Sequence, residues 1–277
     1  MAQVWLVTGS SRGLGRSIVE AGLAAGHHIL ATARNTETLS DLPQRYQNQV
    51  KLFALDVTGE SAASRAVETA VDAFGSLDVV INNAGYGNLS SVEDTSISGF
   101  RAQIETNLFG TIIVTKAALP YFRERRAGRF IQVSSIGGRI GPPGRAPYSA
   151  AKWGVEGFSE ALSREVAPLG IKVTIVEPGG FRTDFAGSST ELIEGRPEYD
   201  ATVGASARFQ RNYNGRQPGD PSRAAAAILA LAQMEQPPLR LLLGSDAYFA
   251  AEKNDLARLE EARRWKDLSL STDLETR

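Results

Sequence analysis

The segment Thr8-Gly9-Ser10-Ser11-Arg12-Gly13-Leu14-Gly15 is a glycine-rich turn between a strand-like run and a helix-like run. The run before it, Val4-Trp5-Leu6-Val7, is short and apolar, which is typical of a buried strand. Apolar residues then recur with helical spacing, at Leu14, Ile18, Val19, Gly22 and Leu23. Glycines let a backbone turn tightly, and the free N–H groups at a helix N-terminus attract anions. The sequence therefore predicts a strand-turn-helix unit that binds the pyrophosphate of a dinucleotide.

Strand-like and helix-like runs alternate along the rest of the chain. Strands are predicted near 3–8, 28–33, 50–55, 77–82, 129–134, 171–177 and 239–243, and helices are predicted to start near Gly13, Glu60, Ser96, Pro147 and Pro221. Repeated strand-helix units predict a parallel sheet with helices on both faces, which is a doubly wound α/β fold. No internal repeat or linker divides the sequence, so we expect one domain over residues 1–277.

Two segments differ from this alternation. Residues 179–220 lack clear periodicity and combine scattered glycines with aromatic residues, so we expect a lid loop over the substrate. Residues 246–277 form a C-terminal extension, in which 246–265 is predicted to be a charged helix. We expect the apolar residues of that helix to cover the surface beside the last strand, and hence a homodimer or a monomer.

Composition excludes several classes of function. The 30 basic and 31 acidic residues balance, so neither nucleic acid nor an anionic membrane is expected as a partner. The chain has no cysteine, and its two histidines are the adjacent His27 and His28, so no metal site is expected. No apolar run approaches the roughly 20 residues that span a bilayer. A cytoplasmic location is therefore expected.

Six further motifs follow the glycine-rich turn in order: Leu55-Asp56-Val57, Asn82-Asn83-Ala84-Gly85, Asn107, Ser134-Ser135, Tyr148-x-x-x-Lys152 and Pro178-Gly179. With the turn, they make the first 185 or so residues resemble the short-chain dehydrogenase/reductase family. The spacing of Gly9, Gly13 and Gly15 is that of the compact oxidoreductase branch, and it differs from that of the epimerase and dehydratase branch. The resemblance implies a Rossmann-like sheet of seven strands. It also implies hydride transfer between a nicotinamide cofactor and a carbonyl or alcohol carbon.

Tyr148 and Lys152 are the central catalytic candidates. They are four residues apart in a predicted helix, so both side chains lie on one face. A phenol with a pKa of about 10 is a poor acid-base catalyst near neutrality, and an adjacent ammonium favours the phenolate. Lys152 is therefore predicted to tune Tyr148. By resemblance, Lys152 also holds the nicotinamide ribose, Ser135 hydrogen-bonds the substrate oxygen, and Asn107 anchors a water that links Lys152 to solvent.

Each of these candidates has a structural alternative. An isolated Tyr-x-x-x-Lys pair is usually a surface feature, and here the accompanying motifs favour catalysis. Ser134 competes with Ser135; neighbouring strand residues point to opposite faces, and the spacing in the family selects Ser135. Asn107 can satisfy backbone groups where its helix is interrupted, and Asp56 can be a turn residue.

The end of the second predicted strand bears on the choice of cofactor. NAD-binding proteins place a carboxylate there, whereas Ala31-Thr32-Ala33-Arg34 offers a guanidinium. Arg34 and Arg12 together fit the 2′-phosphate of NADP, so NADP(H) is favoured over NAD(H). The predicted cofactor contacts are Gly9, Ser11, Arg12, Gly13, Leu14, Gly15, Arg34, Asp56, Val57, Asn82, Ala84, Gly85, Tyr148, Lys152, Pro178, Gly179 and Thr183.

The predicted substrate pocket is walled by Tyr86, residues 136–143, Trp153 and the aromatic residues of 179–220, which are Phe181, Phe185, Tyr199, Phe209 and Tyr213. Such a pocket suits a hydrophobic ketone, aldehyde or secondary alcohol. The aromatic residues can instead pack the loop onto the body, and the arginines of the same segment can instead meet an anion. Two rival functions remain open: a non-catalytic NADP-binding regulator and an NAD-dependent alcohol dehydrogenase.

Overall fold

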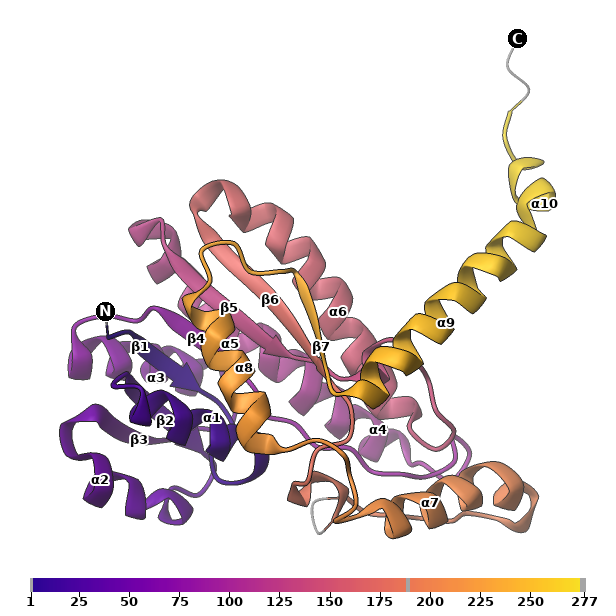
Figure 1. Ribbon diagram of the computed structural model, residues 1–277, viewed down its shortest axis with the longest axis horizontal. Helices are drawn as coiled ribbons and strands as arrows, with labels where there is room; N and C mark the ends of the chain where they lie inside the picture. Colours follow the sequence, from indigo (N-terminus) through magenta and orange to yellow (C-terminus); the bar gives the residue numbers. More distant parts are fainter. Residues whose placement is uncertain (1, 188–189, 275–277) are drawn as a thin grey trace.

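The computed structural model describes residues 2–187 and 190–274, which contain a parallel seven-stranded sheet (Figure 1). Its strands are β1 (Val4–Val7), β2 (His28–Ala33), β3 (Val50–Ala54), β4 (Val79–Asn82), β5 (Gly128–Val133), β6 (Ile171–Pro178) and β7 (Arg240–Leu243). They lie in the order β3-β2-β1-β4-β5-β6-β7, and every neighbouring pair is parallel. The chain therefore starts in the middle of the sheet, builds one edge and then the other. This confirms the predicted doubly wound fold.

Helices cover both faces of the sheet. Alternate residues of β1 face opposite ways: Trp5 and Val7 join one apolar core, and Leu6 joins the other. The first core is covered by α1 (Gly13–Ala24), α2 (Asp41–Tyr46) and α8 (Pro221–Gln233). The second is covered by α3 (Glu60–Phe74), α5 (Gly110–Arg125) and α6 (Ala146–Val166). All four residues of β1 are buried, as a strand between two helical layers must be.

Local sequence explains where several helices begin and end. Asp220 accepts a hydrogen bond from the Ser222 backbone N–H at 2.8 Å, and Pro221 follows it at the first position of α8. Gly75 ends α3 in the left-handed region, with φ +79°. Gly22 lets α1 approach the sheet closely, because a Cβ there would lie 2.7 Å from Ile29 Cδ1.

A helix starts near Ser96, as predicted, and it is interrupted at Asn107. Ser96 caps α4 (Ile97–Ile104), and the helix continues through a π-turn at Glu105–Phe109 into α5. The π-turn places Asn107 on the inner side of the helix, fully buried. Insertions of this kind often occur at functional sites.

The segment 179–220 is less irregular than its sequence suggested. It contains a π-turn at Asp200–Gly204 that leads into α7 (Ala205–Tyr213). In α7 the buried residue is Ala207, which joins Leu89 and Val203 in a small satellite core. Most residues of α7 are polar, so few apolar residues mark this helix in the sequence, and this explains why α7 was missed.

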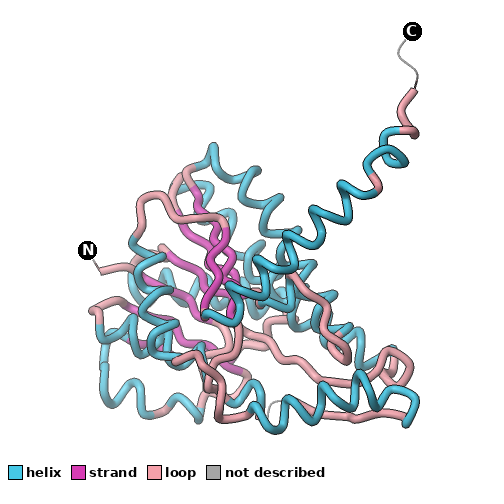
Figure 2. The backbone as a smooth tube through the Cα atoms, turned by 45° about the vertical axis from the view of Figure 1, so that its right-hand side comes forward, coloured by secondary structure: helices cyan, strands magenta, loops and turns pink. Residues whose placement is uncertain are grey.

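The C-terminal extension contains α9 (Ser245–Arg264) and α10 (Lys266–Leu270). The expectation that this helix covers the surface beside β7 is wrong, because α9 leaves the body after its first turns and projects away from it (Figures 1 and 2). Ala247 and Ala251 are buried at its root, whereas Phe249 and Leu256 are 65% and 58% exposed. Small residues thus face the domain and large apolar ones face solvent. Among the described residues, no helix is long and apolar enough to cross a membrane.

Candidate active site

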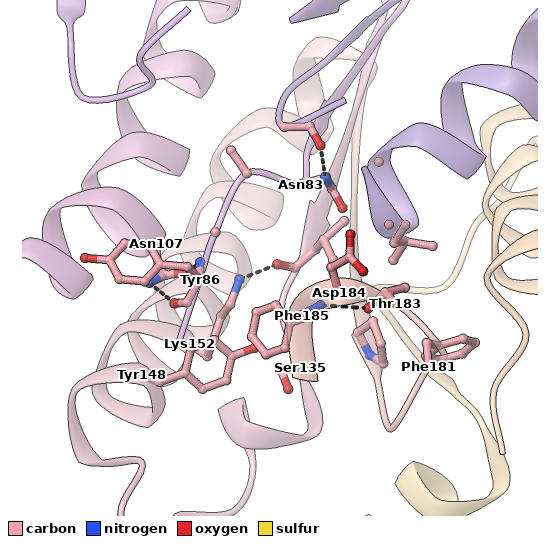
Figure 3. A pocket seen from close by; sticks show the side chains of 18 of the residues that line it. Asn83, Tyr86, Asn107, Ser135, Tyr148, Lys152, Phe181, Thr183, Asp184 and Phe185 are labelled. Atoms are coloured by element: carbon pink, nitrogen blue, oxygen red, sulfur yellow. Dashed lines mark hydrogen bonds between the residues drawn. The ribbon is translucent and has the colours of Figure 1, made fainter. Parts of the chain in front are cut away.

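A cavity of about 440 Å³ lies at the carboxyl ends of the strands, where doubly wound sheets bind ligands. Its walls come from the glycine-rich turn and from the segments that follow β2, β3, β4, β5 and β6, with α6 and α7 closing one side. Figure 3 shows the part of this cleft around Tyr148. Of the predicted site residues, all except Asn82 line it.

The glycine-rich turn has the shape that a pyrophosphate needs. Gly9 and Gly13 have φ values of +67° and +57°, which favour glycine. A Cβ on Gly15 would collide with the Gly9 carbonyl oxygen, so the turn can be this tight only without a side chain. The first N–H groups of α1 have no acceptor within the helix and carry its positive dipole end. The residues present therefore fit the pyrophosphate of a dinucleotide.

Of the two asparagines at the end of β4, Asn82 was predicted to contact the cofactor, and the structure places Asn83 at the cleft instead. The Asn82 side chain is buried away from the cleft and donates to Thr115 Oγ1 at 3.0 Å and to Gln132 Oε1 at 2.8 Å. Asn83 lines the cleft instead, and its Nδ2 donates to the Thr8 and Gly9 carbonyls. It therefore fixes the turn. The two asparagines are neighbours along the chain, and sequence alone did not show which of them faces the ligand.

Ser135, Tyr148 and Lys152 converge on the inner end of the cleft (Figure 3). Tyr148 and Lys152 project from the same face of α6, with the Lys152 Nζ 5.8 Å from the centre of the phenol ring. Ser135 follows β5, and its Oγ accepts from the Gly137 N–H at 3.0 Å. Ser134 is buried near Gly138, whose Cβ would lie 2.6 Å from the Ser134 Oγ. Of the two serine side chains, that of Ser134 is directed toward Gly138, which leaves Ser135 as the candidate next to Tyr148.

The pKa values of both helix residues are perturbed. Burial lowers the pKa of Lys152 to about 8, opposed by the negative charge of Glu156. The Lys152 ammonium donates to the Val133 carbonyl at 2.7 Å. Burial raises the pKa of Tyr148, and the Ser135 hydroxyl and a nearby guanidinium oppose that rise. Perturbed titratable groups in a cleft are typical of functional sites.

The guanidinium beside Tyr148 belongs to Arg145, a residue that the sequence analysis missed. It lies immediately before α6, is 9% exposed and lines the cleft. Its Nη1 donates to the Gly87 carbonyl at 2.7 Å, and it forms no ion pair within residues 2–187 and 190–274. Burial lowers its pKa, as expected for a cation without a counter-charge. Its position three residues before Tyr148, about one helical turn away, was the available signal.

Asn107 ties the π-turn to the segment after β4. Its Nδ2 donates to the Tyr86 and Gln103 carbonyls, each at 2.8 Å, and its Oδ1 accepts from the Tyr86 N–H at 3.1 Å. Gly85 is required beside it, because a Cβ there would lie 2.5 Å from the Asn107 Oδ1. Asn107 thus satisfies backbone groups where its helix is interrupted, which is the structural alternative given above. The same contacts hold Tyr86 at the cleft.

Arg12 and Arg34 lie at the far end of the cleft, where both are exposed. Asp56 faces the same region, and its Oδ1 accepts from the Thr58 N–H at 3.0 Å and the Thr58 hydroxyl at 2.8 Å. These bonds, with the positive charge of Arg34, lower the pKa of Asp56. Asp56 is therefore a turn residue that also lines the cleft.

The predicted aromatic wall is only partly present. Tyr86, Phe181, Phe185 and Tyr213 line the cleft, and the Phe185 ring lies 5.6 Å from that of Tyr148. The remaining three lie outside it: Trp153 lies beneath Arg258, Tyr199 donates to Glu93, and Phe209 stacks on Tyr213.

The sequence also missed Asp246 at the start of α9. Its Oδ2 accepts from the Gly180 N–H at 2.7 Å and from the Tyr213 hydroxyl at 3.3 Å. It thereby joins the segment after β6 to α7, and nothing in the sequence placed it near the cleft.

Comparison with known proteins agrees with this geometry. Residues 3–193 match the family model described as short chain dehydrogenase. The oxidoreductase BOA17 of Botryotinia fuckeliana (strain B05.10) is 46% identical, over 98% of this chain and 100% of the relative. A short-chain dehydrogenase from Streptomyces avermitilis is 40% identical, with a TM-score of 0.93 over 99% of this chain and 100% of that one.

A solved structure of ElxO with NADP bound is 26% identical, with a TM-score of 0.73 over 87% of this chain and 96% of that one. The strand order, the cleft and the family match over residues 3–193 lead to one conclusion. The chain is an oxidoreductase that belongs to the short-chain dehydrogenase family.

Proposed function

We propose that this protein is an NADP-dependent carbonyl reductase or alcohol dehydrogenase. The observation that carries the proposal is the convergence of Ser135, Tyr148 and Lys152 at the inner end of a cleft whose outer end holds Arg12 and Arg34. The cofactor supplies or accepts hydride when it is bound. The side chains of this chain then have to orient the substrate oxygen and move one proton.

Tyr148 is the proton donor for reduction and the proton acceptor for oxidation. Its raised pKa keeps the phenol protonated near neutrality, which suits reduction. Ser135 orients the substrate oxygen toward the phenol. Below a pH of about 8 Lys152 is an ammonium, and it stabilises the negative charge that develops on Tyr148 during proton transfer.

The preference for NADP rests on the charges at the outer end of the cleft. Arg12 and Arg34 are cations with no ion-pair partner in the described part of the chain, so both are available to a 2′-phosphate. Ala33 ends β2 where a carboxylate would otherwise select NAD. The NADP-bound structure of the related ElxO supports the same choice.

The substrate end supports an apolar carbonyl compound. Phe181, Phe185 and Ile136 contribute apolar surface, and Phe185 packs against the phenol that transfers the proton. A ketone, an aldehyde or a secondary alcohol with an apolar substituent fits these walls.

The test is to follow NADPH consumption with a panel of aliphatic ketones, aryl ketones and aldehydes, with NADH in parallel. Turnover of at least one carbonyl compound is expected, faster with NADPH than with NADH. Tyr148→Phe serves as the matched control, because it removes one hydroxyl from the site. Tight NADPH binding without turnover of any compound would contradict the proposal and favour a cofactor-binding regulator.

A further inference from the structure

Helix α9 presents a stripe of large side chains that the domain does not cover. The stripe consists of Tyr248, Glu252, Leu256, Leu259 and Arg263. With about 100° between successive helix residues, these positions lie within an arc of about 80°. Tyr248, Leu256 and Leu259 are 51%, 58% and 47% exposed. Exposed large apolar residues flanked by charges on one side of a helix are typical of an interaction surface.

Contacts on the neighbouring side of α9 fix the direction in which it projects. Ala247 and Ala251 are buried against the body. Asp255 accepts from Arg139 Nη1 at 2.7 Å, and Asn254 Nδ2 donates to the Arg139 carbonyl at 3.2 Å. Arg258 lies 4.8 Å from the centre of the Trp153 ring. The stripe lies beside these contacts and is exposed, on a helix that projects away from its own domain (Figure 2).

The order of residues in the stripe is complementary to itself when reversed. Consider a second α9 that runs antiparallel, with a twofold axis midway between Ala257 and Arg258. Each residue on one side of the axis then lies opposite the partner residue that is equally far from the axis on the other side. Leu256 then meets the partner's Leu259, and Glu252 meets the partner's Arg263. A twofold axis makes each of these contacts occur twice. The centre of the stripe is thus apolar, and an ion pair flanks it on each side.

The charges of the stripe are available for this pairing. Among the described residues, Asp255 with Arg139 is the ion pair that α9 makes, and Glu252 contacts the Tyr248 hydroxyl at 3.5 Å. Outside the stripe, α9 carries acidic and basic residues in similar number. A helix that binds an anionic membrane surface would instead have a basic polar face. The pattern therefore favours a protein partner with the same order of charges.

We propose that a second copy of this chain binds to α9, so that two α9 helices pair antiparallel through the stripe. Leu268 and Leu270 of α10, which are 65% and 54% exposed, extend the contact toward the root of the partner's α9. The proposal is independent of the enzyme activity. It depends only on the fixed direction of α9 and on the order of residues in the stripe.

The test uses charge reversal in the full chain, with the assembly measured by light scattering after size exclusion. The wild type is expected to be at least a dimer. Glu252→Arg and Arg263→Glu each place like charges opposite one another, so each is expected to halve the mass. The double variant restores both pairs with reversed sign and is expected to regain the wild-type mass. An equimolar mixture of the two single variants is expected to form mixed pairs, although neither assembles alone.

Glu261→Arg is the matched control, because it reverses one charge on a face of α9 far from the stripe and is expected to keep the wild-type mass. Circular dichroism and NADPH binding establish that each variant is folded. A monomeric wild type, single variants that keep its mass, or a double variant that stays dissociated would overturn the proposal.

Discussion

The cofactor preference can be reversed at the end of β2 by combining Ala33→Asp with Arg34→Gln. Ala33 is the last residue of β2, is 5% exposed and pairs with Ala54 of β3. Its backbone is therefore held in the sheet, and a carboxylate at this position would lie at the rim of the cleft. It repels a 2′-phosphate and accepts hydrogen bonds from the ribose hydroxyls of NAD. Arg34→Gln removes the cation that we assign to the phosphate.

The size of the effect follows from exposure. A charge-assisted hydrogen bond contributes about 1.5 to 3 kcal/mol, and the lower value applies to Arg34 because it is exposed. About 1.4 kcal/mol corresponds to a factor of ten, so Arg34→Gln alone is expected to lower kcat/KM for NADPH about tenfold. With the new carboxylate, the ratio of kcat/KM for NADPH to that for NADH is expected to change by about a hundredfold or more.

The assay measures kcat/KM for both cofactors at saturating carbonyl substrate. Arg223→Gln is the matched control, because the Arg223 side chain is 90% exposed and lies outside the cleft. If the double variant keeps the NADPH-to-NADH ratio of the wild type, these two positions do not recognise the phosphate.

Tyr148→Phe is expected to keep NADPH binding and to lower turnover at least about a hundredfold, since general acid-base catalysis contributes about that much; near-normal kcat would refute its role. Arg145→Met removes a cation that lowers the pKa of Tyr148, so the rate of alcohol oxidation should begin to rise at a higher pH than in the wild type. Arg145→Lys restores the cation and should move this rise back to lower pH. The rate of carbonyl reduction should decline above a pH of about 8, where Lys152 loses its proton. Glu156→Gln removes a charge that raises the pKa of Lys152, so this decline should begin at lower pH. An unchanged pH profile in either case would exclude the assigned cause. For the lid proposed over 179–220, NADP should increase the protection of its backbone amides in hydrogen exchange, and equal protection with and without NADP would exclude closure.

The sheet was predictable because its signals are local. Seven short apolar runs separated by helical periodicity are a property of neighbouring residues, and each run became a strand at the predicted place. The helices were less completely predicted: α7 was missed, and the helix that starts near Ser96 was predicted without an end. α7 buries Ala207 alone, and α5 follows a π-turn that shifts the helical register at Asn107. The apolar pattern of a sequence does not reveal a helix that has few apolar residues, or the point at which a helix changes its pitch.

The predicted site residues could be placed in one cleft for a different reason. Motifs at the ends of parallel strands meet at one edge of the sheet, so Gly9, Asp56 and Ser135 could be placed together before any contact was known. Which of two neighbouring residues faces the ligand was harder to predict. Strand alternation says only that neighbours point in opposite directions, and the spacing in the family selected Ser135 over Ser134, whereas no such argument was available for Asn83 over Asn82.

The sequence by itself determined the doubly wound sheet, the glycine-rich turn, and the placement of Tyr148 and Lys152 on one helix face, because these depend on residues close together in the chain. Only the tertiary structure decided that the Arg145 guanidinium is buried with no ion-pair partner in the described part of the chain and that Asp246 holds Gly180. It also decided that α9 leaves the body. These features depend on which distant segments share a surface, and spacing along the chain does not encode that.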